Sequence, residues 1–362
     1  MNEDIQDDIE LLNLMLKDYN NQEFLYKPGP YWENYSARIT KAIKYYGLKN
    51  FKSNSLILNG YDEAIPISPF DLVPTSPLKH MIRKIAQNPI LSKFFHYPYD
   101  LKTIIKYSDH LFNQIVNYKS KYYNNILNDW YSKFLNKYSL PNTLAGKPHI
   151  INTILLNNNK IGAEYLTAFI DIHNYSKVVN FDKIKTVFEI GGGYGAFAHS
   201  LLTIFPNIKK YIYLNIPPIL YVGTQYLKYF FGKNVKNYRQ TSKYKKIHFS
   251  SDDKIEIIAL CPWQIEMVEA EVDFFWNSYS FQEMTRDILV NYLNYIQYFL
   301  KNYNSKIGLR MYTNGSSRSL SLKDIEKIFQ KNTFFHLDEL KADINIKNDK
   351  YYFGYLKNTL KS

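Results

Sequence analysis

The stretch from Val187 to Gly195 constrains the fold more than any other part of this 362-residue chain. The residues Val-Phe-Glu-Ile lead into Gly-Gly-Gly-Tyr-Gly, and the helical sequence Ala-Phe-Ala-His-Ser-Leu-Leu-Thr-Ile-Phe follows at once. A buried strand that enters a glycine-rich turn and then a helix exposes backbone amides at the start of that helix. The turn therefore predicts a ligand that touches the backbone.

The sequence after residue 150 predicts an α/β sheet. Short β-rich runs occur at Thr186–Ile190, Lys210–Leu214, Ile255–Leu260, Val272–Trp276 and Lys306–Tyr312. Because helical stretches separate these runs, we expect a parallel sheet with helices on both faces.

The first 150 residues predict a mainly helical region. Apolar spacing indicates helices at Asp4–Tyr19, Tyr31–Tyr46, Leu78–Ala86, Leu101–Val116 and Tyr122–Lys137. A loop rich in proline lies between Asn59 and Pro77. We therefore divide the chain into a helical region, residues 1–150, and a sheet domain, residues 151–362, which opens with a helix at about Gly162–Asn174.

Composition excludes several classes of protein. Hydrophobic residues make up 46% and charged residues 22%, which argues against wholesale disorder. The single cysteine, Cys261, excludes an intramolecular disulfide and a thiolate metal cluster. The acidic start is unlike a secretory signal, and no apolar run reaches the length of about 18 residues that a membrane span needs. We expect a soluble, cytoplasmic protein.

The formal net charge of +12 permits binding to nucleic acid or to an anionic surface. However, the 34 Tyr and 23 Phe, together with abundant Asn, Ile and Lys, match the bias of an A+T-rich genome. The lysines are spread along the chain, so the charge alone does not predict a nucleic-acid partner.

The acid before the glycines indicates which ligand the turn holds. Read with Ala196, the turn also fits the dinucleotide pattern G-x-G-x-x-A. Glu189 lies at the carboxyl end of the strand, where a carboxylate attracts an ammonium group and repels a pyrophosphate. A cationic ligand is therefore favoured.

The pattern E-x-G-x-G-x-G resembles the first motif of class I S-adenosyl-L-methionine (SAM)-dependent methyltransferases. With the later stretches Y-L-N-I-P-P, C-P-W-Q-I-E and W-N-S-Y-S-F-Q-E-M, residues 145–360 resemble the sugar O-methyltransferases of bacterial surface-polysaccharide gene clusters. The resemblance implies a Rossmann-like sheet completed by a hairpin at Phe334–Leu337 and Tyr351–Leu356. It also implies SAM as cofactor and a sugar or nucleotide sugar as acceptor.

The resemblance assigns cofactor contacts at the ends of four strands. The expected residues are Glu189, Gly191, Gly193, Gly195, Asn215, Trp263, Gln264 and Asn277. Asn215 departs from the family pattern, in which an Asp takes this position, and an amide lacks the charge-assisted bond that a carboxylate gives to ribose hydroxyls. Trp263 or Gln264 is expected beside the adenine.

Methyl transfer to a sugar hydroxyl calls for a general base. Glu283 is the first candidate because it follows the fourth strand, and His80 and His149 come next. No two of the eight histidines are four residues apart, and we expect no metal, although Mg²⁺ ligands can scatter in sequence. Aromatic residues of the amino-terminal half offer a platform for sugar rings: Tyr31, Trp32, Tyr35, Tyr61, Phe70, Tyr97, Tyr99 and Trp130.

Three alternatives remain open. A nucleic-acid methyltransferase fits the charge, but the sequence after the fourth strand, Asn-Ser-Tyr-Ser, lacks the Pro-Pro-aromatic motif of base-modifying enzymes. A nicotinamide-dependent oxidoreductase fits the glycines, but Glu189 argues against it. A non-catalytic relative is supported by Asn215 alone.

Overall fold

The computed structural model describes residues 4–54, 57–58, 101–300, 305–313, 320–332, 335–345 and 349–357. The chain forms two compact units. The first comprises Met1–Asp7 and Ala37–Phe169, and the second comprises Asp8–Ser36 and Ile170–Ser362. Residues 8–36 thus belong with the sheet, whereas the sequence division assigned them to the helical region. The helix expected at Leu78–Ala86 lies outside the described residues.

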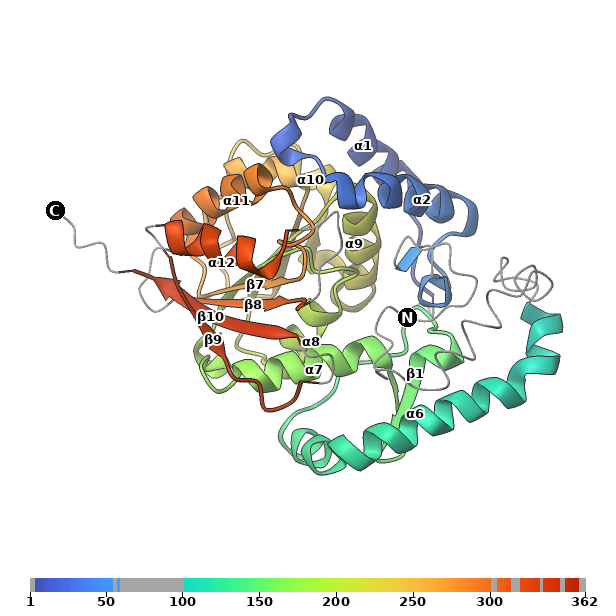
Figure 1. The fold of residues 1–362 in the computed structure, drawn as a ribbon. Coiled ribbons are helices and arrows are strands. Elements are labelled where there is room, and N and C mark those ends of the chain that lie inside the picture. The colour runs from blue at the N-terminus through green and yellow to red at the C-terminus, as the bar shows by residue number, and fades with distance from the viewer. Residues whose placement is uncertain are drawn as a thin grey trace. The chain divides into compact units, whose positions relative to one another are not determined.

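Eight strands of the described chain form one sheet in the second unit, in the order β5-β6-β4-β3-β7-β8-β10-β9. Figure 1 labels the strands of this sheet from β7 to β9. The strands are β3 (Thr186–Ile190), β4 (Lys210–Leu214), β5 (Val235–Lys236), β6 (Glu256–Leu260), β7 (Phe274–Ser278), β8 (Lys306–Met311), β9 (Phe335–Leu340) and β10 (Lys350–Leu356). The first six strands in the sheet order run parallel, and β10 runs antiparallel to both β8 and β9. The predicted parallel sheet with a closing hairpin is confirmed.

Helices cover both faces of this sheet. The helices that lie wholly or partly in the second unit are α1 (Ile9–Asn20), α2 (Pro30–Tyr46), α7 (Ala163–Tyr175), α8 (Ala196–Ile204), α9 (Pro217–Phe231), α10 (Tyr238–Thr241), α11 (Arg286–Phe299) and α12 (Leu322–Lys331). On the face beneath α11 and α12, Phe188 and Ile190 of β3 join an apolar cluster with Leu293 of α11 (Figure 1). On the opposite face, the ring of Trp276 stacks on Phe197 of α8 with centroids 4.6 Å apart.

The strand order creates a crevice at the carboxyl ends of the central strands. Strand β3 lies between β4 and β7, so the chain leaves β3 toward one side of the sheet and later returns on the other. Such a switch point separates the loops that follow neighbouring strands, and open α/β sheets bind ligands there.

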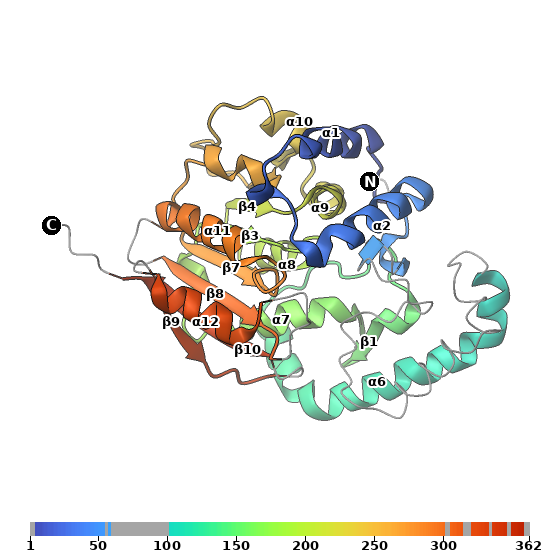
Figure 2. The ribbon, with the colours of Figure 1, turned by 45° about the horizontal axis from the view of Figure 1, so that its top comes forward.

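The amino-terminal segment of the second unit is fastened to its helices. Figure 2 shows α1 beside α9 and α10. Arg239 of α10 donates two hydrogen bonds of 2.9 Å to the carboxylate of Asp8, and the hydroxyl of Tyr238 donates to Asp18 at 2.7 Å. These contacts hold residues 8–36 against the sheet domain.

The first unit differs from the sequence prediction in two places. A single helix, α6 (Leu101–Lys137), replaces the two helices expected there, because no glycine or proline interrupts residues 117–121. A hairpin of β1 (Thr153–Leu156) and β2 (Asn159–Gly162) was missed. Its two turn residues, both asparagines, have φ angles of +47° and +64°, a geometry that asparagine tolerates better than most residues.

A buried ion pair joins α7 to the sheet. Arg310 of β8 donates to the two carboxylate oxygens of Asp171 at 2.8 and 2.7 Å. Their side chains are only 5% and 3% exposed, so neither charge has water as an alternative partner. The pair is therefore needed to keep the two charges inside the protein.

Removing one partner should expose this dependence. We expect Asp171→Asn to lower the free energy of unfolding by about 3 kcal/mol, because Arg310 would stay buried with only the carboxylate of Asp349, 3.9 Å away, as counter-charge. Urea unfolding measures the loss. The control is Glu269→Gln, which breaks a largely exposed pair with Lys246 and should cost less than about 1 kcal/mol. Equal losses in the two variants would contradict the role of the buried pair.

Candidate functional site

The turn after β3 adopts the left-handed backbone that its glycines allow. The φ angles of Gly191, Gly193 and Gly195 are +77°, +58° and +94°. A Cβ at Gly191 would overlap the side chain of Ser280, so this position is closed on its outer side. At Gly193, by contrast, no atom of the described residues lies within 4 Å of a Cβ. Gly193 therefore leaves open space where a side chain would project. Its N–H donates to the carbonyl of Gly191 at 2.8 Å, and its carbonyl accepts from the side chains of Tyr213 and Asn215.

A cleft lies at the carboxyl edge of the sheet, and all its walls belong to the second unit. Residues that follow β3, β4, β6 and β7 form one side, and the start of α11 and residues 27–32 form the rest. Its apolar wall includes Leu214, Ile216, Pro28, Pro262, Met284 and Ile288. Its polar groups are the side chains of Lys27, Trp32, Asn215, Ser280, Glu283 and Tyr292. A mostly apolar cleft with a few polar groups is typical of small-molecule sites.

Glu189 lies beneath the glycine turn rather than in the wall of this cleft. Its carboxylate would overlap a Cβ at Gly192, and it accepts a hydrogen bond of 2.8 Å from the hydroxyl of Tyr211. Burial raises the pKa of Glu189 to about 8, so the group is largely protonated at neutral pH. A positive charge close to it would favour the ionised form.

Asn215 lines the cleft and also shapes the loop before α9. Its Oδ1 accepts from the backbone N–H of Ile216 at 2.9 Å, and its Nδ2 donates to the carbonyl of Gly193 at 3.4 Å. The side chain thus links the end of β4 to the glycine turn, and the residue lines the cleft.

Neither Trp263 nor Gln264 lines the cleft; Pro262 does. The amide of Gln264 donates to Thr241 at 3.0 Å and accepts from the backbone of Cys261 at 2.9 Å. The indole N–H of Trp263 donates to the hydroxyl of Tyr238 at 3.2 Å. In this geometry, both side chains hold the loop that follows β6.

Asn277 ties together the ends of two central strands. Its Nδ2 donates to the carbonyl of Ile190 at 2.9 Å and to the hydroxyl of Ser280 at 2.6 Å. The side chain is almost fully buried. Asn277 therefore fixes the segment 278–285 against the glycine turn.

Glu283 faces the cleft with both carboxylate oxygens paired. The indole N–H of Trp32 donates to Oε2 at 2.8 Å, and the hydroxyl of Tyr312 donates to Oε1 at 3.2 Å. Burial raises the pKa of Glu283, and these two hydrogen bonds oppose that rise. Sequence reasoning missed Tyr312 altogether and gave Trp32 a role only in sugar stacking. No local pattern links Trp32 to a residue 251 positions away.

Of the two histidine candidates, only His149 is among the described residues. His149 belongs to the first unit, where burial lowers its pKa to about 4 and keeps the ring neutral at pH 7. His80 lies outside the described residues, as do four of the expected platform aromatics: Tyr61, Phe70, Tyr97 and Tyr99. The rings of Tyr31, Trp32 and Tyr35 pack together with centroids 5.6 to 5.9 Å apart.

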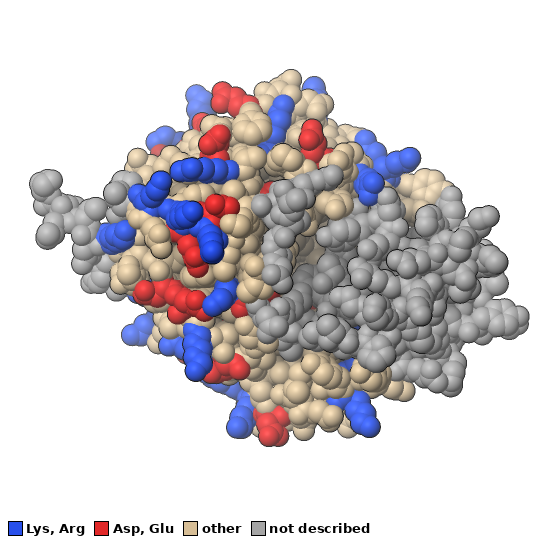
Figure 3. Space-filling model, viewed as in Figure 1, with Lys and Arg blue, Asp and Glu red and all other residues tan. Residues whose placement is uncertain are grey.

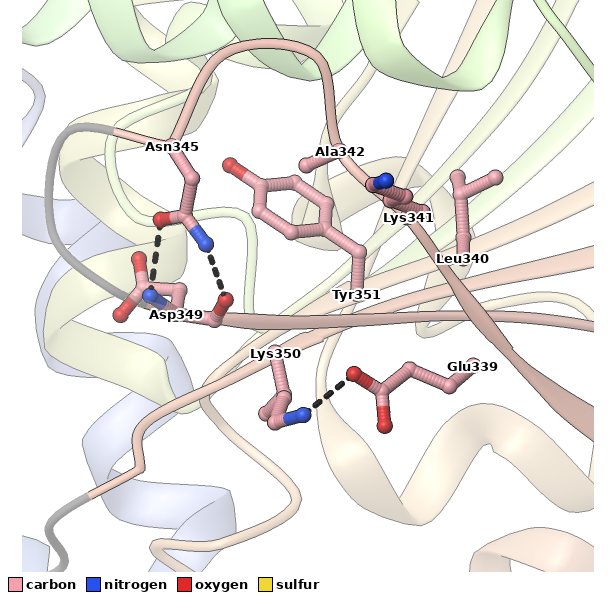
Figure 4. Close-up of a pocket in the computed structure, with 8 residues that line it drawn as sticks. All are labelled: Glu339, Leu340, Lys341, Ala342, Asn345, Asp349, Lys350 and Tyr351. Atoms are coloured by element: carbon pink, nitrogen blue, oxygen red, sulfur yellow. Dashed lines mark hydrogen bonds and ion pairs between the residues drawn. The ribbon is translucent and has the colours of Figure 1, made fainter.

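A second cavity, of about 240 Å³, lies at the β9–β10 hairpin (Figure 4). Asn345 and Asp349 bind each other there through two hydrogen bonds, and Lys350 pairs with Glu339. None of the predicted site residues that the structure describes lines this cavity.

The described residues contain no group of three or more His, Cys, Asp or Glu side chains placed to hold a metal ion. None of their helices has the length and apolar character needed to cross a membrane. On the face drawn in Figure 3, Lys and Arg lie among Asp and Glu rather than in a separate patch.

No model of a known protein family matches the sequence, and no curated protein matches it either. Among solved structures, mitomycin 7-O-methyltransferase is similar at 14% identity, with a TM-score of 0.39 over 54% of this chain and 55% of that chain. Human N-acetylserotonin methyltransferase in complex with SAM is similar at 11% identity, with a TM-score of 0.36 over 53% of this chain and 53% of that chain. Magnesium protoporphyrin IX methyltransferase from Synechocystis PCC 6803 with bound SAM is similar at 8% identity, with a TM-score of 0.35 over 67% of this chain and 97% of that chain. The matched region spans about half the length of the first two proteins.

The buried carboxyl of Glu189 makes stability depend on pH. Its folded-state pKa of about 8 exceeds the ordinary value of 4.5, so the folded protein retains a proton that the unfolded chain has released at intermediate pH. The free energy of unfolding should therefore fall as pH rises from about 5 to 8, by up to about 1.4 kcal/mol per pH unit.

The Glu189→Gln side chain cannot titrate, so the variant should lack this contribution to the decrease in the free energy of unfolding with pH. Urea unfolding of both proteins at pH 5.5 and at pH 8 measures it: relative to the wild type, the variant should gain stability at the higher pH. The same pH slope in both proteins would show that Glu189 titrates normally.

Proposed function

We propose that the protein is a SAM-dependent O-methyltransferase that binds its cofactor at the carboxyl edge of β3, β4 and β7. One observation carries the proposal: open space lies where Gly193 would carry a side chain, at the switch point of the sheet, and the buried carboxyl of Glu189 lies beneath the same turn. A cationic ligand suits this pairing because its charge favours the ionised carboxylate, whereas a pyrophosphate does not.

The residues of the edge fit the parts of the cofactor. The open space at Gly193 would accommodate the amino acid part, and Glu189, beneath the same turn, is the acid proposed to respond to its ammonium group. Asn215 offers an amide to the ribose hydroxyls, and the apolar wall formed by Leu214, Ile216 and Pro262 suits a purine. Trp263 and Gln264 serve the same end by holding the loop that carries Pro262. Bound there, the cofactor supplies an electrophilic methyl group.

Glu283 is the proposed general base. Its carboxylate faces the cleft, and its burial brings its pKa closer to a neutral working pH than that of an exposed glutamate. Glu283 accepts the proton that the acceptor hydroxyl loses as its oxygen is methylated. Positioning the hydroxyl and taking its proton are the two contributions that this chain's side chains make.

The proposed acceptor is a sugar hydroxyl of a precursor in bacterial surface-polysaccharide biosynthesis. This part rests on the resemblance of the stretches Ser280–Met284 and Pro262–Gln264 to sugar O-methyltransferases. The packed rings of Tyr31, Trp32 and Tyr35 add apolar faces of the kind on which sugar rings stack. A screen of nucleotide sugars with methyl-labelled SAM tests the acceptor class.

Calorimetric titration of the full chain with S-adenosylhomocysteine, and with NAD⁺ in parallel, tests the cofactor. We expect binding of S-adenosylhomocysteine only. Gly193→Asp should abolish it, because the new side chain occupies the open space and its negative charge repels the ligand's carboxylate. The positive φ angle of this position adds strain.

Gly232→Asp is the matched control. Gly232 also has positive φ, +54°, and open space around it, but it lies after α9 and away from the cleft. This variant should bind S-adenosylhomocysteine like the wild type. Binding of NAD⁺ alone, or of neither ligand, would overturn the proposed cofactor.

A further inference from the structure

We propose that Tyr312 is a positioning residue for the Glu283 carboxylate and that Trp32 completes the same clamp from the opposite side. The inference rests on the proposed function, in which Glu283 is the base. It adds two residues to the site, neither of which sequence reasoning had connected with Glu283.

The clamp is a pair of hydrogen bonds to different oxygens of one carboxylate. Trp32 donates to Oε2 at 2.8 Å and Tyr312 donates to Oε1 at 3.2 Å. A carboxylate held at both oxygens keeps one orientation, with lone pairs left for a third donor such as an acceptor hydroxyl. Both donors are neutral, so they orient the charge without cancelling it.

The backbone of Tyr312 is fixed by the neighbour of Glu283 itself. Its N–H donates to Oε1 of Gln282 at 2.6 Å, and its carbonyl accepts from Nε2 of Gln282 at 3.2 Å. Gln282 is fully buried. Gln282 and Glu283 are consecutive, and they thus bind the backbone and the hydroxyl of Tyr312, the residue that follows β8.

The ring of Tyr312 is fixed by a stack that reaches into the core. It lies 3.9 Å from the ring of Tyr279 with an angle of 2° between the planes. Tyr279 in turn faces the guanidinium of Arg310 at 4.5 Å and donates to Asp349. Tyr279 has a φ angle of +66°, which is costly for a residue with a bulky side chain and persists only where surrounding contacts hold it. The strain lies directly between the buried ion pair and the clamp.

Trp32 reaches Glu283 because the chain before it approaches closely. A Cβ at Gly29 would lie 3.1 Å from the carbonyl oxygen of Glu283, tighter than ordinary contacts. Glycine therefore lets residues 27–32 lie against the segment that carries Glu283, and the indole of Trp32 then faces the carboxylate.

Among the described residues, other titratable groups near the clamp lie before α2, on α2, on α11 and, as Tyr279, after β7. Lys27 and Tyr292 line the same cleft, and Tyr31 acts on Tyr312. Each clamp bond stabilises the ionised form of Glu283 and lowers its pKa. Loss of either donor should therefore raise the pKa of Glu283 and shift proton-dependent activity to higher pH.

The test compares pH–rate profiles of methyl transfer in three variants. In Tyr312→Phe, the acidic limb of the pH–rate profile should move to higher pH by roughly one unit. The value of kcat should fall at pH values below the shifted limb, and KM for SAM should change little. Trp32→Phe should shift the limb in the same direction. Glu283→Gln should lower kcat by about 10²- to 10⁴-fold at every pH.

Tyr352→Phe is the matched control. The hydroxyl of Tyr352 donates to Glu326 at 2.5 Å, so the variant also removes a tyrosine–glutamate hydrogen bond. Neither of these two residues lines the cleft. Its limb should coincide with that of the wild type. A lower kcat in Tyr312→Phe without movement of the limb would mean a merely structural role and would overturn the proposal.

A second readout separates this inference from the proposed function. In protein labelled with ¹³C at the glutamate carboxyls, the Glu283 signal is the one that Glu283→Gln removes. Its midpoint should rise in Tyr312→Phe and stay in Tyr352→Phe. A rise in a protein that transfers no methyl group would support the clamp and contradict the proposed function. Identical midpoints in Tyr312→Phe and the wild type would overturn the clamp.

Discussion

The left-handed backbone between β3 and α8 is the constraint on which the carboxyl edge depends. With Gly191 closed by Ser280 and Gly193 open, the turn passes close to the segment after β7 on one side and leaves open space on the other. Asn277 converts this proximity into hydrogen bonds to Ile190 and Ser280. The position of Glu283 follows, because the segment that carries it is held against the turn.

The edge contains two buried carboxyl groups in different surroundings. Glu189 lies beneath the turn with one tyrosine hydroxyl as partner, and its pKa of about 8 makes it mainly neutral at pH 7. Glu283 faces the cleft, where two donors support its ionised form against burial. Buried acids that differ in partners and exposure to ligand suit different tasks. We propose that Glu189 stabilises the positive charge of the cofactor and that Glu283 accepts the proton of the acceptor hydroxyl.

The parts of this architecture that depend on local sequence could be predicted. The five strands expected in the parallel sheet end within two residues of those observed, because apolar β-rich runs bounded by turns record burial directly. The single helix α6 and the Asn157-Asn158 hairpin were missed. In α6 the expected gap contains no helix breaker, and in the hairpin the asparagine turn is a weaker signal than one with glycine.

The clamp could not be predicted, because its contacts join residues far apart in the chain. Trp32, Glu283 and Tyr312 meet only when residues 8–36 pack with the sheet, which no local periodicity encodes. The roles of loop residues were also hard to predict. Gln264 lies after the end of a strand, where ligand-binding residues often lie, yet both ends of its amide bind the protein.

A crystal structure of the full chain with S-adenosylhomocysteine tests the central claim most directly. The account predicts the ligand at the carboxyl edge of the sheet, against the open face of Gly193, with Asn215 in contact and Glu283 facing the side from which an acceptor enters. A ligand bound elsewhere, with Gly193 still facing open space, would contradict the assignment of the glycine turn as the cofactor site.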